Sequence, residues 1–562
     1  MSDTTGESGV GAARPADRLT PWLFALAIFT SASLVFVVQP MVTKLVLPML
    51  GGSPAVWNTA MVFFQAALLA GYLYAHLLQR VGSIRVQVLA HLGLLLAAAL
   101  FLPLHINGWL GDPDPSAPIG WLLATLALSV GAPFAVLSAT APLLQAWFAR
   151  VRAGYPDGKN PYVLYTASNL GSFLALLSYP FVIEPLTTLF GQRMAWTGGY
   201  GAFLLMVAGL ALIVWRRRLD RDAEPARLAA TPAIPWRDKG ILILLAAAPS
   251  SLMLGVTAHL STDVASAPFL WVIPLALYLL TFVIAFQTRP WIPLPVTLVL
   301  QAAFGAVVVV VVAFRTLDIR VAFVIHILAF FLAALMCHQT LARRRPPPDR
   351  LTEFYLLLSV GGVVGGAFTA LVAPVMFDMV WEYPLVLVLV GLARPWDRRR
   401  LRGEETGALI AAAMLAAGAA GLSAWMTVDA EAWAGLWRML PLFPLQTLCM
   451  VILGPAVVCA FLLRDRAQAF TAALLMIALS AQFVTRGYDA SYSERSFFGV
   501  MRVAHQIDER MGGRVHILTH GTTWHGAQAR DERYDCQPGM YYHPLTPIGQ
   551  ATEIVQARGP AR

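Results

Sequence analysis

The chain has 562 residues, of which 58% are hydrophobic and 13% are charged, and its mean hydropathy is +0.66. Soluble domains have about 45–50% apolar and about 25% charged residues, so this composition excludes a water-soluble globular protein and predicts a lipid-covered one. The net charge of +9 comes from arginines in short loops between apolar runs, which favours membrane topology over nucleic-acid binding. The cysteines Cys337, Cys449, Cys459 and Cys536 form no CxxC pair, so neither a disulfide framework nor a zinc site is expected.

Residues 1–20 form a polar N-terminal tail that carries Asp3, Glu7 and Asp17. The tail has neither the basic n-region nor the small-residue cleavage site of a signal peptide. We therefore expect the first apolar run to be a retained helix.

The rest of the chain is dominated by apolar runs, and a spanning helix needs about 20 mostly apolar residues. Fifteen runs qualify, which predicts an all-α polytopic membrane protein with about 15 transmembrane helices. The runs lie at 21–40, 54–78, 86–104, 118–140, 162–183, 194–215, 241–257, 266–286, 294–314, 321–341, 354–376, 379–393, 407–427, 445–463 and 467–485. The run 379–393 is short and contains Glu382, which leaves open whether it spans.

Two pairs of neighbouring spans resemble each other. PLLQAWFARVRAGYPDGKNPYVLYTASNLGSFLALLSYP and LAALMCHQTLARRRPPPDRLTEFYLLLSVGGVVGGAFTALVAP share an arginine loop with proline, an aromatic pair and a Ser/Gly patch. The copies lie six spans apart, so they point the same way and suggest a 6+6 parallel repeat, as in major facilitator transporters. Chance similarity between apolar helices is the rival explanation. The predicted organisation is a first membrane half at 21–215, a basic cytoplasmic loop at 216–240, a second half at 241–393 and additional helices at 394–485.

Lysine and arginine concentrate in every second loop, which predicts an inner-membrane protein with a cytoplasmic N-terminus. The rich loops are 79–85, 149–161, 216–240, 342–353 and 394–406. Loops 105–117 and 258–265 contain neither residue, whereas 315–320 is an exception with Arg315 and Arg320. Fifteen spans place the segment after 486 outside, and one miscounted span reverses that side.

A group of glycines in the eleventh run forms two overlapping GxxxG pairs: Gly361, Gly362, Gly365 and Gly366. Small residues at this spacing let two helices approach closely, so helix packing is the favoured role and a substrate path the alternative. No Asp or Glu lies clearly in the middle of a span, and because a proton-coupled transporter usually needs one there, this absence weighs against a transport function without excluding it.

Residues 486–562 are polar and hold five of the eleven histidines. FFGVMRV and RVHILTHG, separated by a GG turn signal, predict a short C-terminal β-hairpin or a small sheet. The histidine spacings do not match a metal-ligand pattern, so no metal site is expected.

Several long segments between residues 21 and 550 resemble those of one known protein family. In the C-terminal part they are ERSFFGVMRV, GRVHILTHGTTWHGAQ and YYHPLTPIGQ, and in the membrane part they are LSATAPLLQAWFAR, YTASNLGSFLALLSYP and LTEFYLLLSVGGVVGGAFTALVAP. They resemble the bacterial membrane-fused spermidine-synthase-like (aminopropyltransferase) family. The resemblance implies that 486–562 is a truncated N-terminal β segment of the synthase part. The substrate-binding residues that it implies are His520, Gly521, Thr522, His525, Gln528, Tyr541, Tyr542 and His543.

After PIGQ the family would continue into a Rossmann-like domain, whereas this chain reads ATEIVQARGPAR. The resemblance therefore implies no catalytic residue and no cofactor in this chain, because decarboxylated S-adenosylmethionine would bind the missing domain. The expected partners are the lipid bilayer and either a separate Rossmann-like domain or a small polyamine, with no nucleic acid. The leading hypothesis is a synthase-like membrane protein that is not catalytic alone. The alternative is a transporter-like or scaffold module for polyamines or another small amphipathic molecule.

Overall fold

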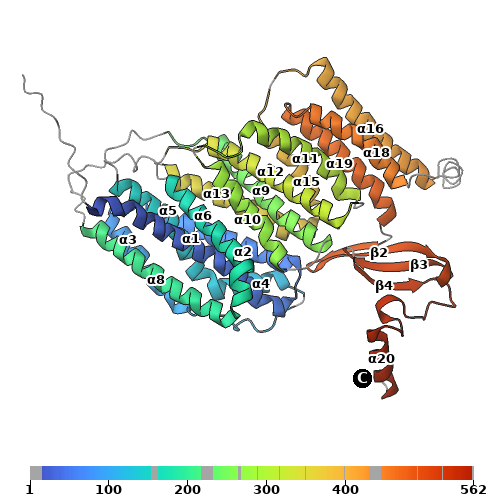
Figure 1. The fold of residues 1–562 in the computed structure, drawn as a ribbon, viewed down its shortest axis with the longest axis horizontal. Helices are drawn as coiled ribbons and strands as arrows, with labels where there is room; N and C mark the ends of the chain where they lie inside the picture. The colour runs from blue at the N-terminus through green and yellow to red at the C-terminus, as the bar shows by residue number, and fades with distance from the viewer. Residues whose placement is uncertain are drawn as a thin grey trace, which may run out of the picture.

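The structure is a computed structural model. It describes residues 15–114, 116–152, 162–216, 232–263, 268–287, 289–314, 317–347, 350–397, 399–428, 445–489, 492–521 and 523–559. A large helical body is joined at one end to a small sheet, and a single helix, α20, follows the sheet (Figure 1).

Helices of membrane-spanning length make up the body. Within the described residues, twelve helices are long and apolar enough to cross a bilayer, and three shorter apolar helices lie at 270–285, 382–393 and 446–462. Each of the fifteen predicted runs contains one of these helices. The chain is therefore a multi-pass membrane protein, as the composition predicts.

The first membrane half contains six spans, some of them made of consecutive helical segments. They are α1 (Pro15–Leu50), α2 (Pro54–Leu78), α3 (Ile84–Ala98) with η1 (Ala99–Phe101), α4 (Pro118–Leu126) with η2 (Ala127–Gly131) and α5 (Ala132–Val151), α6 (Tyr162–Ser178) with η4 (Tyr179–Ile183) and α7 (Glu184–Leu186), and α8 (Leu189–Arg216). Local sequence fixes the start of α2, where the Ser53 side chain accepts a hydrogen bond from the Ala55 amide and Pro54 occupies the first turn.

The second half repeats this plan. Its segments are α9 (Trp236–Asp263), α10 (Pro268–Ala285), α11 (Leu294–Phe314), α12 (Ile319–Arg343), α13 (Leu351–Ala367) with η6 (Phe368–Val372) and α14 (Ala373–Met376), and α15 (Glu382–Leu389) with η7 (Val390–Ala393).

The two halves use the same helix pairs. In the first half α1 packs against α2, α5, α6 and α8, and in the second α9 packs against α10, α12, α13 and α15. Likewise α3 contacts α5 and α8, and α11 contacts α12 and α15. The π-helical segments η4 and η6 interrupt the fifth span of each half at corresponding places. This agreement supports the predicted 6+6 parallel repeat.

Three additional helices form a layer on the second half. α16 (Gly403–Val428), α18 (Leu445–Leu462) and α19 (Ala467–Asp489) pack on one another (Figure 1). α18 and α19 also pack against α11, and α19 packs on α15. Their connection begins at Arg394, a buried residue whose guanidinium donates to the Leu298 and Arg464 carbonyls at 2.9 and 2.8 Å. These bonds hold the end of α15 and η7, which together are shorter than the ~20 residues of an ordinary span.

The C-terminal segment forms a four-stranded antiparallel sheet in the order β1-β2-β3-β4, the larger of the two predicted forms, a hairpin or a small sheet. Its strands are β1 (Tyr492–Ser496), β2 (Gly499–Asp508), β3 (Gly513–His520) and β4 (Thr523–Ala529). The predicted strands correspond to β2 and β3, and the GG turn lies between them, with φ of 75° at Gly512. β1 and β4 are polar, and therefore the apolar pattern that predicts β2 and β3 does not extend to them. The helices η8 (Glu509–Met511), η9 (Met540–Tyr542) and α20 (Pro547–Ala557) complete this part.

Candidate functional site

The seam between the two membrane halves is the candidate site. It consists of two equivalent helix pairs, α2 with α13 and α6 with α10. The helical body has an arginine end and a sheet end. The arginine end is where α2 and α12 end and α13 begins, close to Arg80, Arg343 and Arg350, and the sheet end is the opposite one, where β1–β4 lie.

A short polar chain crosses the middle of the α2–α13 pair. Gln65 Nε2 of α2 donates to Ser250 Oγ of α9 at 3.0 Å, and the Ser250 hydroxyl donates to the Gly362 carbonyl of α13 at 2.8 Å. Nearer the sheet end, Asn58 Nδ2 donates to the Leu254 carbonyl at 3.2 Å. Hydrogen bonds between spans give the two halves a defined register without placing a charge in the bilayer.

Polar contacts also join the halves at the arginine end. The Tyr355 hydroxyl of α13 donates to Gln145 Oε1 of α5 at 3.0 Å. His76 Nδ1 of α2 lies 3.0 Å from Thr352 Oγ1 of α13. Hydrogen bonds thus join the two halves along the α2–α13 pair and its neighbours α5 and α9.

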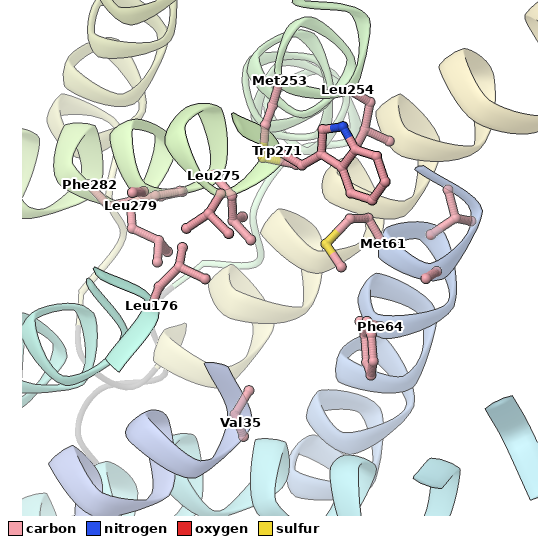
Figure 2. Close-up of a cluster of buried hydrophobic side chains, with 14 of the residues drawn as sticks. Val35, Met61, Phe64, Leu176, Met253, Leu254, Trp271, Leu275, Leu279 and Phe282 are labelled. Carbon is pink, nitrogen blue, oxygen red and sulfur yellow. The ribbon is translucent and has the colours of Figure 1, made fainter. Parts of the chain in front are cut away.

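The centre of the seam is apolar. Figure 2 shows side chains of both halves meeting there, with Met61 and Phe64 from α2, Leu176 from α6 and Trp271 from α10. Trp57 and Trp271 place their ring centroids 5.7 Å apart across the two halves. A ligand that binds between these helices would meet mainly hydrocarbon and ring surfaces.

The glycines of α13 differ in what surrounds them. A Cβ atom at Gly361 or Gly365 would collide with the Ile243 or Ala247 carbonyl of α9, and one at Gly366 would collide with the Gln65 amide. Nothing lies within 4 Å of a Cβ built at Gly362. Three of the four glycines therefore lie at close helix contacts, and two of these contacts are inside the second half.

A cavity of about 80 Å³ lies at the sheet end of the seam. Ser53 and Asn58 of the first half, Thr369 and Glu382 of the second half, and Phe497 at the turn between β1 and β2 contribute to its walls. For comparison, an apolar cavity of about 150 Å³ holds benzene, so this one has room for only a few heavy atoms.

The carboxylate in this cavity wall is paired with a residue of the sheet. Arg495 donates to Glu382 through Nη2 at 2.8 Å and through Nη1 at 3.0 Å, and also to the Met379 carbonyl at 2.6 Å. The Glu382 side chain is 1% exposed and that of Arg495 is 10% exposed. The sequence flagged Glu382 as an anomaly in a short span, but nothing in the sequence linked it to Arg495, 113 residues away.

Two further carboxylates of the two halves are paired as well. Glu184 pairs with Lys44, and Glu353 pairs with Lys239 at 2.7 Å and with Arg350 at 3.2 Å. A polyamine carries several ammonium groups and needs unpaired carboxylates, so these pairs argue against a polyamine site.

A hydrogen-bonded group that sequence analysis did not assemble lies inside the second half. His326 Nδ1 of α12 is 2.9 Å from the Tyr383 hydroxyl of α15, and His326 Nε2 is 3.3 Å from His259 Nε2 of α9. Gly255 allows Tyr383 to pack this closely on α9. The group holds three helices of one half together.

The residues predicted from the synthase resemblance are dispersed over the sheet. His520 and His525 lie near each other, with ring centroids 6.1 Å apart, and Gly521 borders the cavity. Gln528 pairs in register with His516, farther along β4. Tyr541 and Tyr542 lie in η9 and His543 follows it, all three exposed, while Thr522 lies outside the described residues. Burial and the neighbouring His525 lower the pKa of His520. Their roles as substrate ligands stay a prediction.

No family model matches the chain, and no curated protein matches it. Solved structures of membrane transporters do match. The inward-open xylose transporter XylE from E. coli has a TM-score of 0.42 at 14% identity, over 65% of this chain and 94% of that one. A bacterial homolog to the human lysosomal transporter Spinster, inward-facing and unoccupied, has 0.41 at 15%, over 84% and 97%. The E. coli fucose:proton symporter FucP has 0.35 at 13%, over 66% and 98%.

The predicted membership of the spermidine-synthase-like family is wrong. The structural neighbours are transporters, and no family model of the predicted kind matches. The motifs that suggested the family lie largely in apolar helices, where composition alone makes segments similar. Because the identities and TM-scores of the neighbours are low, the proposed function rests on the contacts within this chain.

Proposed function

We propose that the protein is a membrane transporter of a small, uncharged amphipathic molecule, and that the two membrane halves rock about the seam. The observation that carries this proposal is the pairing of helices. Both halves are built from the same contacts and meet along two equivalent pairs, α2–α13 and α6–α10. Parallel repeats related by an axis along the membrane normal suit alternating access, because each half moves as a rigid body.

The chemistry of the seam supports the substrate class. Its centre is lined by apolar side chains, the hydrogen-bonding groups Gln65 and Ser250 in its middle are an uncharged amide and hydroxyl, and the carboxylates Glu184, Glu353 and Glu382 are paired with cations. An uncharged molecule with one polar end fits such a lining at lower desolvation cost than a cation. If the arginine end faces the cytoplasm, the sheet lies outside the cell.

Distances between the halves test the proposal without a known substrate. Spin labels are placed in nanodisc-embedded protein after Cys459 and Cys536 are replaced by Ser. One variant labels Gly82→Cys and Trp291→Cys at the arginine end. The other labels Trp109→Cys and Leu317→Cys at the sheet end; all four positions are exposed.

Pulsed electron paramagnetic resonance then gives the distance distributions. A rocking transporter shows two populations at each end, and conditions that lengthen one distance shorten the other. A scaffold gives one population at each end, and that outcome would reject the proposal.

A further inference from the structure

We infer that the turn between β1 and β2 is a latch that holds the sheet end of the seam closed, and that the Arg495–Glu382 pair fastens it. This inference rests on the proposed rocking function and assigns a regulatory role to the sheet. For brevity the segment Arg495–Gly499 is called the latch.

The latch touches both halves at once. The cavity that it borders is lined by Ser53, Pro54 and Asn58 of the first half and by Thr369 and Glu382 of the second. Phe497, at the tip of the latch, packs against the apolar core that the two halves share. Separation of the halves at this end would therefore pull Phe497 away from one of them.

The contact between Arg495 and Glu382 has a specific geometry. Both Glu382 oxygens accept hydrogen bonds from the Arg495 guanidinium, and the Met379 carbonyl accepts another. A fork-like arrangement of this kind fixes orientation as well as distance. Because the Glu382 side chain is buried, loss of Arg495 leaves a carboxylate without its counter-charge, so the pair stays closed unless both ions are rehydrated.

The backbone of the latch is shaped for this position. Ser496 and Gly499 pair in register, which leaves Phe497 and Phe498 as the two residues of the turn. Gly499 has a φ of 139°, and a Cβ atom there would collide with the His520 ring. Glycine thus lets β3 support the base of the turn while its tip points at the membrane body.

Release of the latch should open the sheet end. In the labelled pair Trp109→Cys and Leu317→Cys, Glu382→Gln and, separately, Arg495→Gln should each raise the ratio of the long to the short distance by about tenfold. Phe497→Ala, which leaves the ion pair intact, should act in the same direction. The exchanged pair Glu382→Arg with Arg495→Glu should restore most of the short distance, because it restores the ion pair across the same contact.

A second ion pair on the sheet supplies the control. Arg533 and Asp531 are joined at 2.6 Å but lie outside the cavity wall, so Arg533→Gln should leave the distribution as in the parent protein. If the two ends rock and neither Glu382→Gln, Arg495→Gln nor Phe497→Ala changes the ratio, the latch is refuted and transport survives. If no variant and no parent protein shows two populations at either end, the proposed function itself fails.

Discussion

At the scale of single residues, some glycines of α13 lie at a close helix contact, whereas another shares only their spacing in the sequence. Gly361 and Gly365 face α9 so closely that a methyl group would overlap the Ile243 and Ala247 carbonyls, whereas Gly362 faces open space. The neighbouring positions share one helix and one residue type. They therefore form a matched set in which only the facing surface differs.

We expect Gly365→Ala to destabilise the protein and Gly362→Ala to leave its stability equal or slightly higher. The overlap with the Ala247 carbonyl forces α13 and α9 apart, and overpacking of this kind costs about 1–3 kcal/mol. At Gly362 the new methyl group meets no atom within 4 Å and only raises helix propensity, by up to ~1 kcal/mol. Thermal unfolding in detergent, followed by tryptophan fluorescence, compares the two variants. Equal melting temperatures would contradict the assignment of Gly365 to the helix contact.

Sequence patterns reach part of this detail. The spacing of Gly361, Gly362, Gly365 and Gly366 predicts a close helix contact, but it does not say which of them face the partner, because the rotation of α13 is set by tertiary packing. Arg495 and Glu382 show that the sequence also does not reveal which distant residues pair. Each was visible in the sequence, and their pairing depends on how the sheet docks onto the helical body.

At the scale of elements, long apolar runs were predictable and polar strands were not. Hydrophobicity over about 20 residues locates a span whatever its neighbours are, so each predicted run holds a helix in the structure. β1 has the sequence YSERS and β4 has TWHGAQA, and neither shows the apolar alternation of a half-buried strand. They become strands because β2 and β3 offer unpaired edges to them.

The sheet should lose stability as the pH falls. His516 of β3 pairs with His505 of β2, and their ring centroids are 4.5 Å apart. Desolvation, followed by the positive charges of His505, Arg530 and Arg514, lowers the pKa of His516. A lowered pKa in the folded state means that the unfolded chain takes up the proton first, so stability is full at neutral pH and falls below about pH 6.5.

Hydrogen exchange of the β2 and β3 amides, corrected for the intrinsic effect of pH, measures this loss between pH 7.5 and pH 5.5. The variant His516→Gln should reduce the pH dependence, and the remainder should come from His520, whose pKa is lowered as well. The matched variant His543→Gln changes an exposed histidine outside the strands and should keep it. Equal pH dependence in the parent and in His516→Gln would show that His516 does not control the sheet.

At the scale of the whole molecule, the repeat was predictable only as a weak similarity between helices. Its strongest evidence is the set of shared pairings, such as α1 with α6 and α9 with α13, which cannot be derived from either half of the sequence alone. The two equivalent helix pairs of the repeat also differ in the chemistry of their side chains. The α2–α13 pair carries the hydrogen bonds of Gln65, His76 and Tyr355, whereas the α6–α10 pair contributes Leu176, Leu275 and Leu279 to the apolar centre.

Because the α2–α13 pair carries these polar contacts, a covalent cross-link there should prevent the two halves from separating. His76 and Thr352 are in hydrogen-bonding contact at the arginine end, so a short, reducible thiol cross-linker can join His76→Cys to Thr352→Cys across the seam. With the spin labels at Gly82 and Trp291 attached to a ketone-bearing amino acid instead of cysteine, cross-linking should remove the long-distance population at that end, and reduction should restore it. A matched cross-link at Ser251→Cys and Thr369→Cys, whose hydroxyls are 2.6 Å apart inside the second half, should leave both populations in place. If the cross-link between the halves is formed and the long distance persists, the halves do not separate at α2–α13, and the seam cannot be the path by which a substrate crosses.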